Sequence, residues 1–489
     1  MKSLEHLTFD NTYARLPEAF YQRVQPTPFP NPRLVSFNPR TAEIIDLDPD
    51  EHARSDFPAF FSGGKSLPGS DPLAMLYAGH QFGHYVPQLG DGRAILLGEV
   101  RNAKGETWDL QLKGAGLTRF SRDGDGRAVL RSTIREYLCG EAMHGLGIPT
   151  TRSLCIVSGE EVVWRERPEP GAMLLRMAPS HVRFGTFEVF YYRGQYEYLK
   201  TLADFVIAHD YPHLLDAENR YAQLLHEVAV RTGEMIARWQ AVGWSHGVMN
   251  TDNMSILGLT LDYGPYGFME SYNPAFICNH SDHQGRYAFQ NQPDIGYWNI
   301  RALAKAMSPL LEQTDSHAAP EIYERAMLNT YADLMRGKLG LLEHHVGDDK
   351  LVTDLLNLMD SSRADYTNSF RSLGGFQQNS ADGHTAIRDQ FLHREAFDDW
   401  AVRYRDRLQA EKSQDPERRQ RMNRINPKYV LRNHLAQQAI ELATREQDYS
   451  EIDRLLMLLG EPFTEHPGME QYALPPAPGS APIIVSCSS

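Results

Sequence analysis

The sequence predicts an α+β protein with two lobes, in which strands come first and helices follow. Residues 81–113 combine an apolar run with a segment in which apolar and polar residues alternate, as strands do. From about residue 127 to residue 460, apolar side chains mostly recur three and four positions apart, as on one face of a helix. With 489 residues, 42% of them hydrophobic and 23% charged, the chain can form several compact units.

The first two predicted strands flank a turn. Residues 93–100 are apolar with β-branched side chains, residues 102–105 (Asn-Ala-Lys-Gly) predict a turn, and residues 106–113 alternate. The polar face of the second strand carries three residues: Asp109, Gln111 and Lys113. Residues 24–75 are rich in Pro, Gly and Ser, which is typical of an irregular extension with short elements.

A helix is predicted over residues 127–144, because apolar residues there follow helical spacing and Gly145 stands where a helix would end. Two further strands are expected at residues 153–157 and 172–177. A longer helix is predicted at about 219–242.

Gly233 is expected to be a weak point of this longer helix. Residues 402–432 are dense in charge and predict a solvated helical face. Residues 461–489 are Pro-rich and are expected to be extended or mobile.

The composition excludes several classes of protein. Lys and Arg total 49 against 63 Asp and Glu, a net charge of −14, so we expect no general nucleic-acid binding. No apolar run approaches the ~18 residues of a membrane span, and the N-terminus lacks the apolar region of a signal peptide. Four cysteines are too few for a disulfide scaffold. We therefore expect a cytoplasmic protein with no membrane partner.

Three short motifs have chemical interpretations that their context disfavours. Residues 64–66 (Gly-Lys-Ser) resemble the end of a phosphate-binding loop, but Ala59 replaces the glycine that the motif requires. Residues 243–247 (Gly-Trp-Ser-His-Gly) match a serine nucleophile elbow, but a helix leads into them instead of a strand. Three potential zinc ligands lack an obvious fourth: Cys278, His280 and His283.

Residues 88–94 (Gln-Leu-Gly-Asp-Gly-Arg-Ala) suggest a nucleotide site. Glycines in a hairpin between two strands let backbone N–H groups approach phosphate oxygens. Lys113, on the polar face of the next strand, can reach such a phosphate. Glu136 in the predicted helix is placed to hold this lysine. The alternative is a plain hairpin turn with a surface lysine and a surface glutamate.

A second cluster spans residues 246–253 (His-Gly-Val-Met-Asn-Thr-Asp-Asn) and continues to Asp262. Asp252, Asn253 and Asp262 offer the hard oxygen ligands that Mg²⁺ prefers. We expect the apolar run at 256–261 to carry Asp262 into a cleft on a strand or hairpin. The alternative is an Asx-rich turn.

The order of these pieces is that of a protein kinase: Gly-rich hairpin, strand-end Lys, helix Glu, long helix, His…Asn loop, Asp-Tyr-Gly. The sequence thus predicts a bilobal protein-kinase-like fold. One residue breaks the pattern, because Val248 stands at the position of the kinase catalytic Asp and cannot accept a proton. The nearest carboxylate is Asp252.

The chain resembles the selenoprotein O family of pseudokinase-fold protein adenylyltransferases. Four segments carry the resemblance: QLGDGRA, DLQLKGAGLTRFSRDGDGRAVLRSTIREYL, HGVMNTDNMSILGLTLDYGPYGF and the terminal Cys-Ser-Ser. The resemblance implies transfer of AMP from ATP to Ser, Thr or Tyr hydroxyls of proteins, with release of pyrophosphate and a flipped ATP. It also implies Mg²⁺, with Mn²⁺ as an alternative, and self-modification as an additional outcome.

Site residues follow from the matching motifs. Asp252 would accept the proton, Asn253 and Asp262 would hold the metal, and Glu136 would support Lys113. The implied ATP-binding residues are Gly90, Gly92, Arg93, Lys113, Asp125, Gly126, Arg176, Arg183 and Asp262.

The resemblance also implies a redox link between a C-terminal cysteine and one in the body. Cys487 occupies the place of selenocysteine in eukaryotic members, and Cys278 is its matching partner. Cys139 and Cys155 fall in a predicted helix and strand, so we expect both to be buried.

The expected organisation has four parts. They are an N-terminal extension (1–80), an N-lobe (81–195), a C-lobe (196–345) and a helical C-terminal region with a Pro-rich tail (346–489). Two other functions stay open: a kinase-type phosphotransferase that uses Asp252, and a non-catalytic nucleotide-binding pseudokinase. The phosphorus of ATP that ends on protein distinguishes them.

Overall fold

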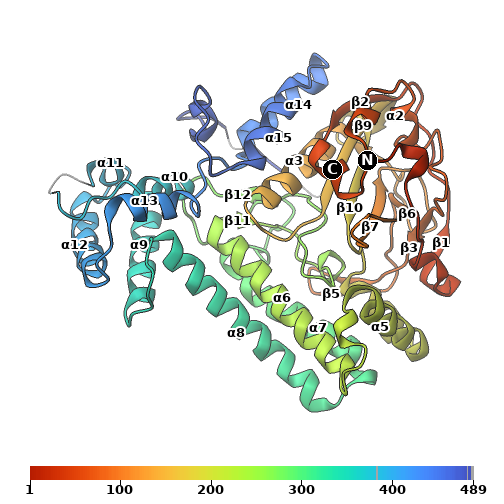
Figure 1. The fold of residues 1–489 in the computed structure, drawn as a ribbon, viewed down its shortest axis with the longest axis horizontal. Coiled ribbons are helices and arrows are strands. Elements are labelled where there is room, and N and C mark those ends of the chain that lie inside the picture. The colour runs from red at the N-terminus through yellow and green to blue at the C-terminus, as the bar shows by residue number, and fades with distance from the viewer. Residues whose placement is uncertain (381–383, 482, 486–489) are drawn as a thin grey trace.

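The computed structural model describes residues 1–380, 384–481 and 483–485. It confirms the α+β prediction, with one lobe built on an antiparallel sheet and the rest of the chain mainly helical (Figure 1).

The sheet lobe contains eight strands in the order β1-β3-β6-β7-β10-β9-β2, with β8 pairing only with β10. All of its pairs are antiparallel. The strands are β1 (Tyr21–Arg23), β2 (Arg33–Phe37), β3 (Leu73–Met75), β6 (Ala94–Arg101), β7 (Thr107–Lys113), β8 (Ala128–Val129), β9 (Arg152–Trp164) and β10 (Pro168–Ala178). Because β1, β2 and β3 belong to this sheet, it extends across the expected boundary between residues 80 and 81.

Two short ribbons lie outside the sheet: β4 (Gly79–Gln81) with β5 (His84–Val86), and β11 (Trp244–Ser245) with β12 (Gly267–Phe268). Two short helices, α1 (Pro39–Ile44) and α2 (Phe57–Phe60), belong to the N-terminal segment. The helix expected from residue 127 begins later, as α3 (Leu130–Gly145), because the two residues before it form β8 and pair with β10.

The helical lobe consists of α4 (Phe184–Tyr192), α5 (Tyr196–Asp210), α6 (Arg220–Val242), α7 (Gln292–Met307) and α8 (Gln313–Lys338). The predicted long helix corresponds to α6. A Cβ at Gly233 would lie 2.7 Å from the backbone oxygen of Tyr323 on α8. The glycine thus serves close helix packing and is not merely a weak point.

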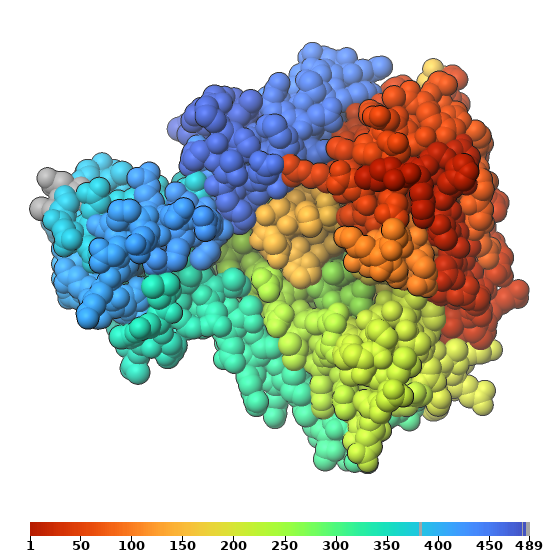
Figure 2. All heavy atoms as spheres, viewed as in Figure 1, coloured from red at the N-terminus to blue at the C-terminus, as the bar shows by residue number. Residues whose placement is uncertain are grey.

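The last part of the chain divides between two places. One group packs around a second core, which contains Trp400 and Tyr404 together with Ala241 of α6 and Met335 of α8: α9 (Asp348–Ser362), α10 (Tyr366–Leu373), α11 (Thr385–Arg388), α12 (Arg394–Ala410) and α13 (Asp415–Asn423). The other, α14 (Asn433–Arg445) and α15 (Ser450–Gly460), packs against α3. Figure 2 shows these blue helices meeting the red N-terminal residues. No helix of the described ranges is both long and apolar enough to cross a membrane.

Candidate active site

A cleft of about 720 Å³ brings the sheet lobe and the helical lobe together. Its lining includes ten of the residues that the sequence predicts for the site: Gly90, Gly92, Arg93, Lys113, Asp125, Gly126, Arg176, Asp252, Asn253 and Asp262. Glu136 and Arg183 are buried and contact residues of this lining.

The Gly-rich segment is a loop and not the expected hairpin. β5 pairs with β4, so residues 88–93 lead into β6 without a hairpin partner. Gly90 has a φ of +127°, and a Cβ there would lie 2.6 Å from the ring of Phe120. A Cβ at Gly92 would lie 2.9 Å from the backbone oxygen of Phe120. Glycine is required here because the loop backbone is pressed against the segment that precedes α3.

Lys113 ends β7 at the wall of the cleft and pairs with Glu136 of α3, as the sequence predicts. Its ammonium is also 3.7 Å from Oδ1 of Asp262. Burial lowers the pKa of Lys113, and the carboxylates of Glu136 and Asp262 act in the opposite direction. The lysine thus lies between two carboxylates, one from each lobe.

Asp262 is the centre of the charge network. Its Oδ1 accepts a hydrogen bond from Arg176, and its Oδ2 accepts one from Arg183. Burial alone would raise the pKa of this carboxyl, but Arg176, Arg183 and Lys113 hold it well below its usual range. The carboxylate is therefore charged at neutral pH.

The backbone around Asp262 differs from the prediction. The apolar run 256–261 forms neither a strand nor a hairpin: a turn at Gly258 interrupts it, and only Thr260 forms an isolated bridge, to Thr150. Asp262 itself has a φ of +57°, a left-handed conformation that aspartate tolerates better than most residues. A tight loop, instead of a strand end, carries the carboxylate into the cleft.

A buried chain of polar groups fixes Arg176. Its Nε donates to Oε1 of Gln111 at 2.6 Å, and Nε2 of Gln111 donates to Asp91 at 3.1 Å. The sequence analysis assigned no role to Asp91 or Gln111. The position of Gln111 on the same strand face as Lys113 was the available signal, because residues two apart on a strand point the same way.

Arg183 contacts both Asp252 and Asp262. Its guanidinium donates to the backbone oxygen of Asp252 at 2.9 Å while it pairs with Asp262, and it lies 4.6 Å from the centre of the Tyr77 ring. The stacking suits a planar guanidinium. Tyr77 is a further cleft residue that the sequence analysis did not identify.

Asp252 lies in a short 3₁₀ turn at residues 251–253. Its Oδ2 accepts a hydrogen bond of 3.3 Å from Gln81, whereas Oδ1 is buried and has no hydrogen-bond partner among the described residues. Burial raises the pKa of Asp252 to about 7, against the hydrogen bond from Gln81 and the charge of Arg183. A buried carboxylate oxygen without a donor can accept a proton.

The adjacent residues belong to the same loop. The side-chain nitrogen of Asn253 donates to the backbone oxygen of Val248 at 2.9 Å, and its carbonyl oxygen is an atom of the type that Mg²⁺ prefers as a ligand. Val248 itself lines the cleft, so the side chain at the kinase Asp position is apolar inside the site.

The loop with Asp125 and Gly126 forms another wall. A Cβ at Gly126 would lie 2.2 Å from the backbone of Gly116, so no larger residue fits. Asp125 pairs with Arg165 at 2.6 Å, and this hydrogen bond lowers its pKa. Arg165 and the 72% exposed Trp164, both near the turn between β9 and β10, also line the cleft. The sequence analysis identified neither.

The cysteines divide as predicted where the structure describes them. Cys139 and Cys155 are fully buried. The Sγ of Cys278 lies 3.5 Å from both side-chain and backbone oxygens of Ser245, and burial raises its pKa to about 12. Cys487 lies outside the described residues. The backbone N–H of His280 donates to the oxygen of Val485 at 2.9 Å, so the described tail ends beside the segment of Cys278.

The three disfavoured motifs gain no support. Lys65 pairs with Asp56 at 2.6 Å and does not line the cleft. Nε2 of His246 contacts the backbone oxygen of Leu261 at 3.1 Å, and no hydrogen bond joins the side chains of His246 and Ser245 in the described part of the chain. In the described part of the chain, no group of three or more His, Cys, Asp or Glu side chains could hold a metal ion, so no zinc site forms around Cys278.

Comparisons with known proteins identify the family of the chain. A family model described as "Protein adenylyltransferase SelO" matches residues 3–459. A protein of Myxococcus xanthus called "Protein nucleotidyltransferase YdiU" is 58% identical over 491 residues, which cover 100% of both chains. Proteins of the same name from Thiobacillus denitrificans and Pseudomonas aeruginosa are 54% and 50% identical, again over 100% of both chains.

Proposed function

The chain belongs to the SelO family of protein nucleotidyltransferases, and on this premise we propose that it transfers AMP from ATP to Ser, Thr or Tyr hydroxyls of proteins. The observation that carries the proposal is the pair of residues at the catalytic loop. Val248 lines the cleft at the position of the kinase catalytic aspartate. In this loop of the described chain, Oδ1 of Asp252 is the carboxylate oxygen that is buried without a hydrogen-bond partner. Asp252 lies further along the loop than the kinase aspartate does. It would therefore place the acceptor hydroxyl near a different phosphorus of ATP from the one that kinases transfer.

The triphosphate would lie against the cations of the cleft. Lys113, Arg176 and Arg183 converge on Asp262 in the ligand-free site, and phosphate oxygens would compete for the same donors. The backbone of the loop with Gly90 and Gly92, together with Arg93, would bind on one side. Asp125 and Gly126 would contact the nucleotide in its flipped orientation.

The donor set fits Mg²⁺. Asn253 has a carbonyl oxygen left for a cation, and Asp262 is a charged carboxylate with 20% of its side chain exposed. Two protein oxygens are few, but Mg²⁺ commonly binds one or two carboxylates together with substrate phosphates. The bound metal would neutralise charge on the triphosphate, and Mn²⁺ suits the same oxygen ligands.

Asp252 would take the proton of the acceptor hydroxyl. As this O–H bond breaks, the acceptor oxygen forms a bond to the α-phosphorus, the bond from this phosphorus to the bridging oxygen breaks, and pyrophosphate leaves. Lys113, Arg176 and Arg183 would stabilise the charge that develops on the phosphates.

Labelled ATP tests the assignment. Label at the α-phosphorus should appear on an acceptor protein or on the enzyme itself, and label at the γ-phosphorus should be released with pyrophosphate. Transfer of γ-label would favour the kinase-type alternative. Binding of ATP without transfer of either label would favour the non-catalytic one.

We also propose that oxidation of Cys278 and Cys487 to a disulfide regulates the enzyme. Cys278 contacts Ser245, just before the catalytic loop, and the described tail reaches His280 beside it. Two thiols would pass two electrons to a disulfide oxidant such as oxidised glutathione. Peptide mapping without reductant should find the bond, and dithiothreitol should change the rate of wild type but not of Cys278→Ser. A free Cys487 after oxidation would refute the proposal.

A further inference from the structure

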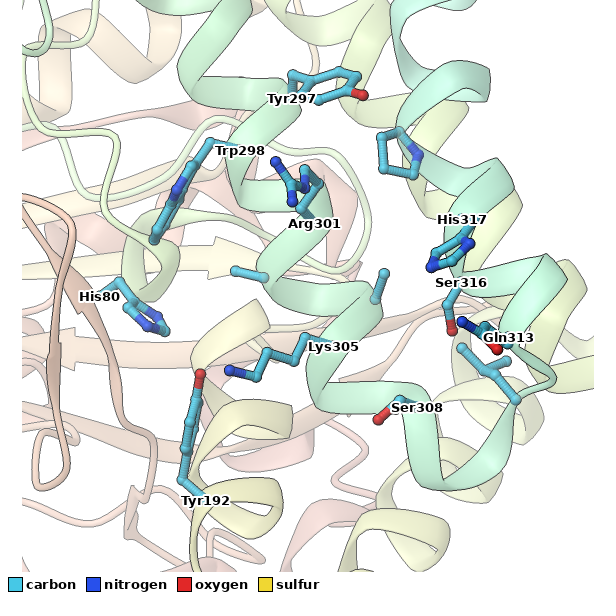
Figure 3. Close-up of a pocket in the computed structure, with 14 residues that line it drawn as sticks. His80, Tyr192, Tyr297, Trp298, Arg301, Lys305, Ser308, Gln313, Ser316 and His317 are labelled. Carbon is cyan, nitrogen blue, oxygen red and sulfur yellow. The ribbon is translucent and has the colours of Figure 1, made fainter.

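A second hollow lies on the helical lobe, separate from the cleft in its lining residues. It has a volume of about 740 Å³ and runs over the outer face of α7, which supplies Trp298, Arg301 and Lys305. Figure 3 shows His80 and Tyr192 on one side, and the first turns of α8 with His317 on the other. We call it the α7 groove.

The lining of the α7 groove carries basic and no acidic side chains, although Nδ1 of His80 contacts the buried carboxylate of Glu188 at 2.6 Å. None of the fourteen described residues that line it is Asp or Glu, although the whole chain has a net charge of −14. Arg301 and Lys305 lie one helical turn apart. Within the described ranges, no hydrogen bond or ion pair engages the guanidinium of Arg301, and Lys305 only faces the ring of Tyr192 at 5.4 Å. Both cations are exposed and available to an anionic partner.

Other features of the groove suit a polypeptide. Trp298 and Tyr192 give it aromatic walls, which are favoured in protein interfaces. Pro320 lies inside α8 and has no N–H, so the backbone oxygen of Ser316 loses its helical donor, and both residues line the groove. An N–H of a docked backbone could supply the missing hydrogen bond.

The ribbon of β4 and β5 joins the groove to the cleft. Successive residues of a strand point to opposite faces, and here His80 lines the groove while Gln81 lines the cleft. The backbone N–H of His80 donates to Oγ1 of Thr251 at 2.7 Å, and Gln81 donates to Asp252. A chain that places its hydroxyl at Asp252 therefore needs to pass only this ribbon to reach the groove.

From these observations we propose that the α7 groove binds an acidic segment of the protein substrate, on the same chain as the hydroxyl that receives AMP. This inference rests on the proposed function. It names the substrate class: proteins in which Asp or Glu residues lie near the modified Ser, Thr or Tyr. Arg301 and Lys305 would pair with the acidic side chains, and Ser316 would accept a backbone N–H.

The test uses the full-length enzyme and synthetic peptides with one serine. A run of Asp residues stands at increasing distances on either side of the serine, and each peptide has a twin with Asn in place of Asp. Transfer of α-label gives KM and kcat. At the best distance, the Asp peptide should have a KM about tenfold below that of its twin, at similar kcat. Equal KM values at every distance would overturn the inference.

Substitutions inside and outside the α7 groove test whether the preference for the Asp peptide arises there. Arg301→Glu with Lys305→Glu should remove the advantage of the Asp peptide. Arg419→Glu with Arg445→Glu is the matched control, because these exposed residues of α13 and α14 give the same change in net charge outside the groove. Arg301→Gln with Lys305→Gln should give a smaller loss, and added salt should raise the KM of the Asp peptide with wild type. An equal effect in the control pair would show a general field and overturn the inference.

Four outcomes distinguish this inference from the alternatives. No α-label on any peptide or protein would refute the proposed function itself, whereas label without acidic preference would refute only the groove assignment. Binding of inorganic phosphate that the Arg301 and Lys305 reversal abolishes, without an acidic-peptide effect, would make the groove a small-anion site. A change of oligomeric state on reversal, again without that effect, would make it an interface between copies of the chain.

Discussion

Two largely buried lysines, one in the cleft and one in the helical C-terminal region, show how differently the molecule treats the same side chain. Lys113 has Glu136 and Asp262 beside its ammonium, and both act against the lowering of its pKa by burial. Lys338, at the end of α8 and only 3% exposed, has no carboxylate partner among the described residues. It faces the rings of Phe370 and Tyr366 at 4.2 and 5.4 Å, and burial lowers its pKa to about 7.

The different surroundings of Lys113 and Lys338 indicate which buried charges are arranged to bind a ligand. A buried cation is costly unless a carboxylate holds it. In the cleft the carboxylates of Glu136 and Asp262 orient the cations, so under the proposed function a phosphate would meet donors that are already in place. Around Lys338, burial destabilises the charged ammonium, and no cluster of charged side chains surrounds it among the described residues. Substitutions at five positions test this comparison.

The largest effect is expected for Asp262→Asn. The variant keeps the shape of the side chain but leaves Arg176 and Arg183 facing a neutral amide, and it removes the proposed metal ligand. Transfer of α-label should fall by about 10³-fold or more. Near-normal turnover in a folded variant would place the metal site elsewhere.

The low pKa of Asp262 also predicts that the stability of the protein depends on pH. Its folded pKa lies below the unfolded value of 3.8, so its stabilising contribution is present above pH ~4 and is lost as pH falls through the folded pKa. The difference in the free energy of unfolding between wild type and Asp262→Asn should therefore shrink in acid, as thermal denaturation at several pH values can show.

Asp252→Asn should lower kcat by about 10²–10³-fold, because the amide cannot accept the hydroxyl proton. The affinity for a fluorescent ATP analogue should remain close to that of wild type, since Asp252 does not contact the cations except through its backbone oxygen. A parallel loss of nucleotide binding would assign Asp252 to the nucleotide and not to the acceptor.

Lys113→Ala should lower α-label transfer by about 10²-fold, and Glu136→Gln by only about tenfold. The lysine is expected to contact phosphate directly, whereas Glu136 only positions it. The double variant should resemble Lys113→Ala, because the glutamate acts through the lysine. An effect of Glu136→Gln that persists without Lys113 would contradict this order.

The smallest effect is expected in the other region and has the opposite sign. Lys338→Met should raise the free energy of unfolding by about 2 kcal/mol at neutral pH, because it removes an unpaired buried cation. Between the folded pKa of about 7 and the unfolded 10.5, the unfolded chain binds more protons, so wild type gains stability as pH rises. The advantage of the variant should be greatest at or below pH 7 and vanish near pH 10.5. Destabilisation at pH 7 would show that the ring contacts outweigh burial.

The sequence was most informative where the structure is local. The turn at 102–105, the two strands beside it and α6 lie where periodicity predicts them, because each depends on near neighbours. The pair of Lys113 and Glu136 was also predictable, since a strand face and a helix face had to meet. Asn253 and Asp262 were selected because residues of their types bind metal ions; the structure places both in the cleft, and their metal-binding role stays a prediction.

Long-range contacts account for what the sequence analysis missed. The short strands β1 and β3 have three residues each, too few for a clear alternation, and tertiary pairing holds them in the sheet. The polar chain from Asp91 through Gln111 to Arg176 joins three segments, and the α7 groove joins residues from 80 to 320. No pattern within one segment signals such a site.

The packing of α14 and α15 on α3 has a consequence for synthesis of the protein. Leu458 and Leu459 belong to the same core as Leu138 and Met143 of the helix that carries Glu136, and Tyr449 accepts a hydrogen bond of 3.1 Å from Arg33. On the ribosome the sheet lobe emerges first, yet the apolar face of α3 stays uncovered until α14 and α15 have also emerged. Chaperones can bind this exposed apolar surface during translation. A nascent chain therefore cannot finish packing the helix that carries Glu136 before α15 has been made.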